Sequence, residues 1–333
     1  MIRKHAWLLA FCAAVAACET PTESTTPDVS LEGVEPTASV VNIWETKASV
    51  LTYRRSAVAG ALNNIIYVVG GRDAASDATK TLQVYTIATN SWAFKADMPV
   101  NRSSANGASF LNGRLYVSGG QSNTGGAMKT LYSYNPNTNT WAKHKNMPVA
   151  AACGAQGVIA DRLYVYAPGI GACGPTHGFY RYNPNNDTWT SLPTPASKHA
   201  SPVGGVIAGK FYLAGGTSNS TLSPNLQLHV YDPGSNSWGA KAWLPTKQQN
   251  GAGAALSGRL FVAGGINFDA PLTPAISTLR AYYPDPGGNF WTSVAPMPTP
   301  RFYAAGVNAG GKLWVISGNG NSGNSTKVEA YTP

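Results

Sequence analysis

The chain has 333 residues, a formal net charge of +9 and 12% charged residues. This length allows two domains, so the domain count has to come from the pattern along the chain. The positive charge points to anionic ligands. It does not indicate nucleic acid, because the sequence lacks basic clusters with interleaved aromatic residues. No window has helical periodicity, which excludes a helical fold.

Residues 1–17 are predicted to be a secretory signal peptide. They begin with Arg3 and Lys4 and continue with an apolar stretch that is too short to span a bilayer after export. The following Val-Ala-Ala-Cys sequence, which ends at Cys18, is similar to a bacterial lipobox, in which the cysteine becomes the lipidated first residue. We therefore expect a protein lipid-anchored in the bacterial cell envelope, on the periplasmic or surface side of the outer membrane. The alternative is ordinary cleavage near Ala16 or Ala17, which leaves Cys18 as an incidental thiol.

Residues 18–37 contain mainly Thr, Pro, Glu and Ser and almost no residue that could be buried. Such a composition predicts a flexible tether between the anchor and a folded domain. The folded domain is expected to span residues 38–333.

Two phrases repeat along that domain. The first is LNGRLYVSGG at 111–120. Similar copies end at Gly71, Gly216 and Gly265, and more divergent copies end at Gly169 and Gly318. The second runs from a tyrosine through an Asn/Pro turn to a tryptophan, as in Tyr134-Asn-Pro-Asn-Thr-Asn-Thr-Trp141. Both phrases recur about every 50 residues, which indicates a repeat architecture.

Each repeat is predicted to hold four short antiparallel strands. The apolar runs are rich in Val, Ile, Tyr and Phe and are bounded by Gly, Asn, Pro and Asp. The double glycine, the tyrosine and the later tryptophan resemble the kelch motif over about residues 40 to 333. This resemblance implies an all-β kelch β-propeller, similar to six-bladed bacterial kelch lipoproteins. The glycines would allow close backbone approach between wedge-shaped blades, and the Tyr and Trp side chains would fill the wider gaps.

The tryptophans give the number of blades. Five fourth strands are marked by Trp92, Trp141, Trp189, Trp238 and Trp291. The sixth repeat ends at Pro333 before its tryptophan can occur, and Trp44 supplies it. We therefore predict six blades in one domain, with an N-terminal strand that closes the last blade and leaves no long edge exposed. A monomer is expected.

Cysteine parity predicts one disulfide. Cys12 leaves with the signal peptide, and Cys153 and Cys173 can pair in an oxidising envelope. Both are expected on one rim of the third blade. The alternative is two separate buried thiols.

A basic ligand-binding face is predicted from the loops that connect each fourth strand to the next blade. These loops carry Arg54, Arg102, Lys198, His199, Lys247 and Arg301. One interpretation is a positive funnel around the channel that binds carboxylates, phosphates or acidic sugars. The other is structural: an arginine before the first strand is frequent in kelch units, where it would stack on its neighbour or bond loop carbonyl groups.

Few residues indicate catalysis, and no cofactor is expected. Among the histidines, His144 and His229 are expected on outer strands, and only His177 and His199 on the loop-rich face; without a third ligand, no metal site is predicted. The copper chemistry of the kelch protein galactose oxidase is therefore not expected. The facing loops offer few carboxylates: Asp73, Asp77 and Asp269.

Two functions follow. The first is a non-catalytic binding or interaction module of the cell envelope that recognises an anionic glycan or protein, because the loops are dominated by Gly, Ser, Asn, Thr and Ala. The second is a sugar mutarotase similar to the bacterial N-acetylneuraminate epimerases, which are six-bladed kelch enzymes. Ring opening needs a proton donor and acceptor near the anomeric centre. The fold alone does not decide between the two functions.

Overall fold

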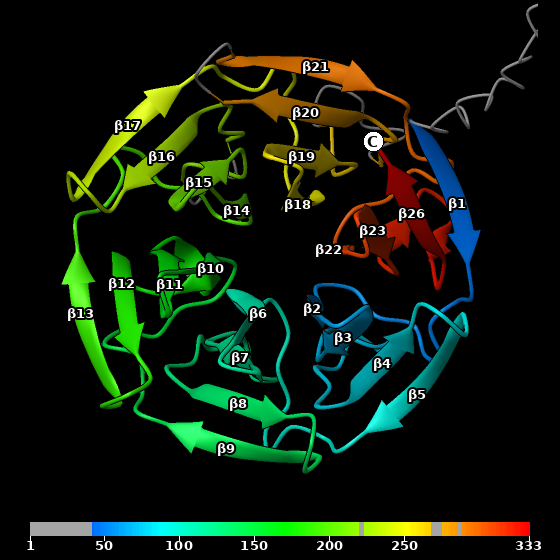
Figure 1. Cartoon of the computed structure of the whole chain (residues 1–333), viewed down its shortest axis with the longest axis horizontal. Coiled ribbons are helices and arrows are strands. Elements are labelled where there is room, and N and C mark those ends of the chain that lie inside the picture. The colour runs from blue at the N-terminus through cyan, green and yellow to red at the C-terminus, as the bar shows by residue number, and fades with distance from the viewer. Residues whose placement is uncertain (1–41, 220–222, 268–274, 285–287) are drawn as a thin grey trace, which may run out of the picture. The chain divides into compact units, whose positions relative to one another are not determined.

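The structure is a computed structural model that describes residues 42–219, 223–267, 275–284 and 288–333. These residues form six four-stranded antiparallel sheets and one two-stranded hairpin. The six sheets stand around a central axis as the blades of a propeller (Figure 1). The predicted all-β, six-bladed fold is confirmed. The predicted signal peptide (1–17), lipidation residue Cys18 and tether (18–37) lie outside the described residues.

The first three blades follow in chain order. Blade one holds β2 (Val58–Leu62), β3 (Ile65–Val69), β4 (Leu82–Thr86) and β5 (Ser91–Lys95). Blade two holds β6 (Gly107–Leu111), β7 (Arg114–Ser118), β8 (Leu131–Asn135) and β9 (Thr140–His144). Blade three holds β10 (Ala155–Ile159), β11 (Arg162–Pro168), the short helix η1 (Gly171–Cys173), β12 (His177–Asn183) and β13 (Thr188–Leu192).

The other three blades repeat this order. Blade four holds β14 (Val203–Ile207), β15 (Lys210–Ala214), β16 (Leu228–Asp232) and β17 (Ser237–Lys241). Blade five holds β18 (Ala252–Leu256), β19 (Arg259–Ala263), β20 (Leu279–Tyr283) and β21 (Phe290–Val294). Blade six holds β22 (Ala305–Ala309), β23 (Lys312–Ile316), β26 (Val328–Thr332) and, outermost, β1 (Ile43–Lys47); the hairpin β24 (Asn319–Gly320) and β25 (Gly323–Asn324) projects from it.

The first strand of every blade lies nearest the axis and the fourth lies at the perimeter (Figure 1). The second and third strands are the most buried, because both of their faces pack on neighbouring blades. The double glycines make this packing possible. Gly70 has a φ of +63°, and a Cβ atom there would lie 2.5 Å from the carbonyl oxygen of Arg102 in the next blade. The predicted role of these glycines in close packing is confirmed.

The Tyr-to-Trp phrase joins each blade to the preceding one. In blade two, Tyr134 donates its hydroxyl hydrogen to Asn139 Oδ1 at 2.8 Å, and the same oxygen accepts the main-chain N–H of Ala96 in blade one at 2.9 Å. Trp141 Nε1 donates to the carbonyl oxygen of Ala96 at 2.8 Å. Equivalent bonds from the indole N–H to the preceding blade are made by Trp44, Trp92, Trp189, Trp238 and Trp291. The phrase therefore specifies hydrogen bonds as well as packing.

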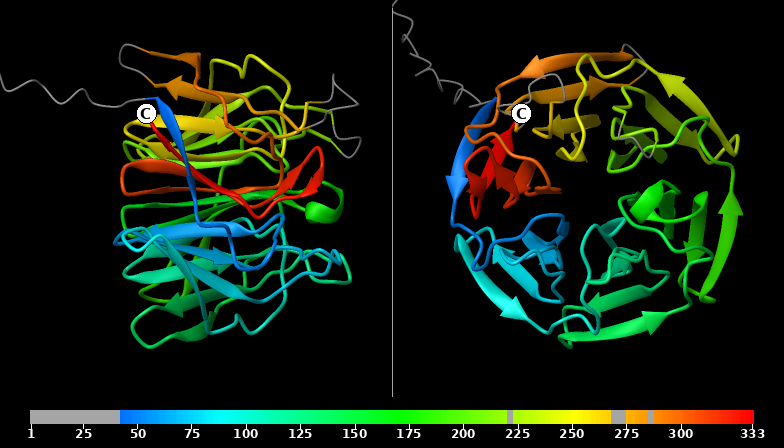
Figure 2. Two further views of the ribbon diagram at one scale, coloured as in Figure 1. Left: turned by 90° about the vertical axis from the view of Figure 1, so that its right-hand side faces the viewer. Right: turned by 180° about the vertical axis from the view of Figure 1, so that it is seen from behind.

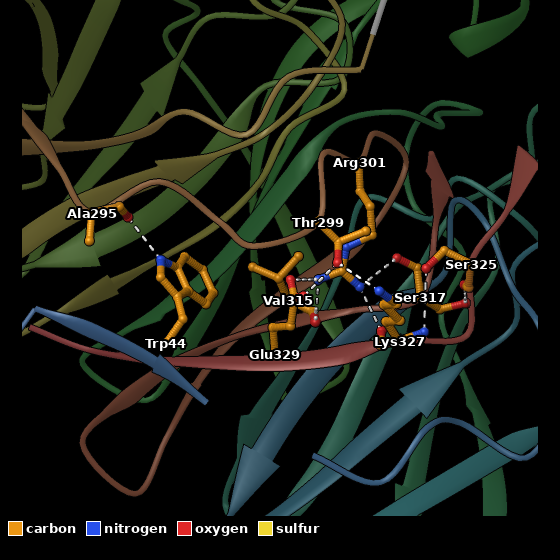
Figure 3. Close-up of polar contacts among 9 residues, drawn as sticks. All are labelled: Trp44, Ala295, Thr299, Arg301, Val315, Ser317, Ser325, Lys327 and Glu329. Atoms are coloured by element: carbon orange, nitrogen blue, oxygen red, sulfur yellow. Dashed lines mark hydrogen bonds and ion pairs between the residues drawn. The ribbon is translucent and has the colours of Figure 1, made fainter. Parts of the chain in front are cut away.

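The ring is closed as predicted by the N-terminal strand. β1 pairs with β26 in antiparallel register, with Trp44 opposite Tyr331. Trp44 Nε1 donates to the carbonyl oxygen of Ala295 in blade five at 2.8 Å (Figure 3). Asn42 Oδ1 accepts hydrogen bonds from the Tyr331 hydroxyl and the Ala295 amide. Residues 42–47 therefore supply to blade six the outer strand, the indole hydrogen bond and the side-chain acceptor that the Tyr-to-Trp phrase supplies in the other blades.

The propeller has two unlike faces. The turn face carries the tight turns, the start of β1 and the C-terminus, whereas the loop face carries η1 and the hairpin β24–β25 (Figure 2). The predicted disulfide between Cys153 and Cys173 is present at the loop face, with a Cα–Cα distance of 5.5 Å. Within the described ranges, no helix combines the length and the apolar character needed to cross a membrane.

Candidate functional site

The central channel has a narrow ring of six equivalent residues just before the first strands, which we call the waist. Its members are Ser56, Ser104, Cys153, Ser201, Asn250 and Tyr303, all with φ between 49° and 55°. Main-chain N–H groups donate around the waist to the carbonyl of the preceding blade, for example from Ser104 to Ser56 at 2.8 Å and from Cys153 to Ser104 at 2.7 Å. The waist therefore fixes the spacing of the blades at the axis.

Two cavities meet at the waist. The channel cavity, of about 420 Å³, is lined by the first strands, and its described lining holds no charged side chain. The mouth cavity, of about 400 Å³, opens on the loop face. Its polar lining beyond the waist includes Arg55, Arg72, Gln121, Thr217 and Gln249. The mouth cavity is therefore the cationic one.

Four of the six predicted ligand-binding residues do not lie at the surface. Arg54, Arg102, His199 and Arg301 are 3%, 1%, 0% and 1% exposed. The expectation that they surround the channel mouth is therefore wrong. Burial lowers the pKa of Arg54 and Arg102 to about 10, so both guanidinium groups stay charged at neutral pH.

These buried side chains bond the double-glycine turn of their own blade. Arg54 Nη1 donates to the carbonyl oxygen of Gly70 at 3.0 Å, and Arg102 Nη1 donates to that of Gly119 at 2.8 Å. His199 Nδ1 and Gln248 Nε2 occupy the equivalent positions at the carbonyl groups of Gly215 and Gly264. A repeated N–H donor at this position is the arrangement that the structural interpretation predicts.

Blade six adds a buried charge pair to this arrangement. Arg301 Nη2 donates to Glu329 Oε2 at 2.7 Å, and both side chains are almost fully buried, at 0% and 2% exposed (Figure 3). Arg301 Nη1 donates to the carbonyl oxygen of Lys327 at 2.6 Å, and the Thr299 hydroxyl donates to Glu329 Oε1 at 2.7 Å. Both charges are thus paired and hydrogen-bonded, as burial of an ion pair requires.

The two predicted lysines lie apart from the cavity. Lys198 is half-buried, and its Nζ donates to the carbonyl oxygen of Gly169 at 2.9 Å. Lys247 is exposed. Neither of these described residues lines the mouth cavity.

The cations that do line the mouth cavity are Arg55 and Arg72, both in blade one. Their main chains form an antiparallel bridge, with N–H to carbonyl distances of 3.0 and 2.8 Å. Arg55 Nη2 donates to Ser76 Oγ at 2.9 Å, and Arg72 Nη1 donates to the Ser76 carbonyl oxygen at 2.7 Å. Two like charges are therefore held side by side by one loop.

The sequence contains a signal that would have found this pair. The position of the buried donor repeats as Arg, His or Gln in five blades, which is typical of a structural role. The next residue changes from blade to blade: Arg55, Ser103, Ala152, Ala200, Gln249 and Phe302. Positions that serve the scaffold repeat from blade to blade, whereas positions that recognise a ligand differ. The variable position, which holds Arg55 in blade one, is therefore the better candidate for ligand binding.

A tyrosine lines the same cavity as these arginines. Tyr303 belongs to the waist and also lines the mouth cavity. Burial raises the pKa of its phenol, and the nearby Arg55 charge opposes that rise. Tyr53 shows the same combination, and its hydroxyl donates to Asn319 Oδ1. Both phenols are therefore neutral and lie within the electrostatic influence of Arg55.

The histidines are arranged differently from the expectation. His199 Nε2 lies 2.8 Å from Nδ1 of His229, and both side chains are buried within blade four. Burial lowers the pKa of His199 to about 4. His177 is half-buried and bonds the Tyr166 hydroxyl at 3.1 Å. Within the described part of the chain, no group of three or more His, Cys, Asp or Glu side chains is placed to hold a metal ion.

Two of the candidate carboxylates, Asp73 and Asp77, lie in a loop of blade one. Asp73 Oδ1 accepts the main-chain N–H of Asp77 at 3.0 Å, so the two residues shape the loop that carries Ser76. Neither of these described residues lines the mouth cavity. Asp269 lies outside the described residues.

Comparison with known proteins gives a family match and a fold match. The KLHDC2/KLHL20/DRC7 Kelch-repeats domain matches residues 35–207, which is just over half of the chain. The solved structure of YjhT is similar with a TM-score of 0.72 at 18% sequence identity, over 85% of this chain and 95% of that chain. At this identity the likeness shows the fold alone. A search among curated proteins gives no match.

Proposed function

Because the chain belongs to the kelch-repeat family of β-propellers, we propose that it is a binding module of the cell envelope that recognises an anionic ligand in the mouth cavity. The observation that carries this proposal is the pair of bridged arginines, Arg55 and Arg72, on one wall of that cavity. The ligand class is the one predicted from the sequence. The arginine of blade one that binds the ligand is Arg55, in place of the buried Arg54.

The arginine pair is suited to an oxyanion with several acceptor atoms. A guanidinium presents a planar fork of N–H donors that matches a carboxylate or phosphate. Two such groups side by side repel each other, and a bound anion relieves that repulsion. A concave mouth also strengthens the attraction of anions from solution. The arginines therefore favour one acidic group placed at blade one.

The rest of the cavity would contact neutral polar groups of the ligand. Gln121 lines the cavity from blade two, with Ser201 and Asn250 at the waist. Thr217 and Gln249 also line it but are buried, at 2% and 6% exposed. Amide and hydroxyl side chains both donate and accept hydrogen bonds, which suits sugar hydroxyl groups. A cavity of about 400 Å³ is within the range for a small ligand or the end of a glycan. An acidic sugar residue, free or at a glycan terminus, combines these features.

A binding screen tests the proposal. Glucuronate and N-acetylneuraminate would be titrated calorimetrically against the neutral sugars glucose and N-acetylglucosamine. We expect binding of acidic sugars alone, with affinity that falls as salt rises. Replacement of Arg55 and Arg72 by Gln should weaken that binding by at least about tenfold, as expected for a lost charged hydrogen bond. Equal affinity of the double variant would overturn the site.

The second proposal is a sugar mutarotase that uses the same mouth. The fold match supports it only at the level of architecture. The described lining of the mouth cavity holds no carboxylate or histidine, and its phenol, Tyr303, has a raised pKa. These residues provide a poor general base, which favours binding over catalysis. Anomerisation followed by NMR in the same titration samples distinguishes the two, because a binding module leaves the exchange rate unchanged.

A further inference from the structure

Blade three departs from the other blades at the mouth. In five blades, the residue before the waist and the residue after the double glycine, which is Ser317-Gly318 in blade six, exchange two main-chain hydrogen bonds. In blade one these bonds join Arg55 and Arg72, and in blade four they join Ala200 and Thr217 at 2.8 and 2.9 Å. The same bridge is present in blades two, five and six. This bridge attaches the loop that connects the second and third strands of each of these blades to the segment that precedes the waist residue.

The bridge is incomplete in blade three. The amide of Ala152 donates to the carbonyl oxygen of Cys173 at 2.8 Å, but the amide of Cys173 donates within its own loop, to Ile170 at 2.9 Å. Blade three also has Ala151 where the other blades have the buried side-chain donor. The second main-chain bond of the bridge, from the amide of Cys173, is missing, and the disulfide from Cys153 to Cys173 links the same two segments. A covalent link therefore replaces the attachment that hydrogen bonds provide elsewhere.

This link reaches the mouth cavity directly. Cys153 belongs to the waist, and Cys173 ends η1. The η1 residues and the preceding Ile170 line the cavity. Gln121 of blade two steadies the same loop, because its Nε2 donates to the carbonyl oxygen of Ala172 at 2.9 Å. Both cysteines are half-buried beside the cavity, so a small reductant can approach them. The loop thus forms a wall whose position depends on the disulfide.

We propose that the Cys153–Cys173 disulfide places anion binding in the mouth under redox control. A dithiol reductant would break the S–S bond: each sulfur gains one electron and one proton, and the dithiol becomes a disulfide. The η1 loop would then keep hydrogen bonds from Ala152 to Cys173, from Gln121 to Ala172 and from Lys198 to Gly169. A ligand would have to order this wall on binding, which lowers its affinity. This inference rests on the proposed function of the mouth.

The test measures the loop and the ligand separately. Full-length protein would be compared before and after dithiothreitol, with the variant Cys153→Ser/Cys173→Ser as the control that cannot respond to reductant. Hydrogen exchange of residues 169–176 reports on the wall. Titration with N-acetylneuraminate and glucuronate reports on binding. We expect faster exchange after reduction and an affinity about tenfold lower, with the double variant fixed at the lower affinity in both conditions.

Each other outcome contradicts a defined step. Unchanged exchange in reduced protein means that the disulfide does not hold the wall, and the inference fails whatever the ligand result. Faster exchange with unchanged affinity leaves the proposed binding site intact but overturns its redox control. If no acidic sugar binds in either state, the proposed function fails and redox control of binding fails with it.

Discussion

The main-chain amide of Ser56 donates a hydrogen bond of 2.8 Å to the carbonyl oxygen of Tyr303, which joins the first blade to the last at the waist. The perimeter is closed separately, where β1 completes the sheet of blade six. Closure near the axis thus needs only main-chain groups in a left-handed turn. Closure at the perimeter combines the main-chain ladder between β1 and β26 with side-chain bonds from Asn42 and Trp44.

Replacement of Trp44 by Ala should lower the free energy of unfolding by about 2–3 kcal/mol, because a half-buried aromatic ring and its bond to Ala295 are lost together. Trp44→Phe should retain most of the packing and cost only about 1 kcal/mol. Urea denaturation measures both values. A chain lacking residues 1–37 should unfold like the full chain, whereas one lacking 1–49 should be much less stable or aggregate through the exposed β26. Equal stability of the two truncations would contradict closure by β1.

Replacements of the adjacent residues Arg54 and Arg55 should have opposite effects. Arg54→Met removes the buried donor to the Gly70 carbonyl oxygen and should lower stability by about 1–3 kcal/mol with little change in ligand affinity. Arg55→Gln should leave the melting temperature nearly unchanged and weaken acidic-sugar binding. Differential scanning fluorimetry and calorimetric titration measure the two effects. The reverse pattern would restore Arg54 as the ligand-binding residue.

Stability should fall as the pH decreases through the histidine range. Burial lowers the pKa of His199 from 6.5 to about 4, so the fold favours the neutral imidazole. This contribution is complete above pH 6.5 and is lost as the unfolded chain gains protons below it. His199→Gln, which copies Gln248 of blade five, should reduce the pH dependence of the melting temperature between pH 7 and 5. An unchanged slope would show that His199 titrates normally in the folded protein.

Replacing Arg301 should lower the free energy of unfolding more than replacing its ion-pair partner Glu329. Arg301→Met leaves a buried carboxylate without its counter-charge and should cost about 3–5 kcal/mol. Glu329→Gln keeps an acceptor for Arg301 and places the residue found at the equivalent Gln83 of blade one, so its cost should be smaller. Urea denaturation of both variants checks this order. A larger loss for Glu329→Gln would contradict it.

The anchoring proposal concerns residues that the structure does not describe. If Cys18 is lipidated, Cys18→Ser should release the protein from membrane fractions or stall it uncleaved. Fractionation followed by immunoblotting measures the distribution, with Cys12→Ser as the matched control that should remain in the membrane fraction. Unchanged membrane association of Cys18→Ser would contradict the lipobox.

The repeat phrases determined the fold because they encode contacts that recur in every blade. Strand alternation, the double glycine and the Tyr-to-Trp spacing each describe a local geometry or a contact with the next repeat. Counting tryptophans gave six blades and identified Trp44 as the missing partner. Cysteine parity gave the disulfide, since only Cys153 and Cys173 remained to pair in the domain.

Only the tertiary structure decided which basic residues face the ligand. Arg54 and Arg55 are neighbours in the sequence, and a turn sends one guanidinium into the blade and the other into the mouth cavity. The pairing of Arg55 with Arg72, and of His199 with His229, depends on loops that differ from blade to blade. The replacement of a main-chain bridge by the disulfide is recognised only by comparing blade three with the five blades that keep the bridge. Repeats therefore specify the scaffold, whereas the site is built from the positions where the repeats disagree.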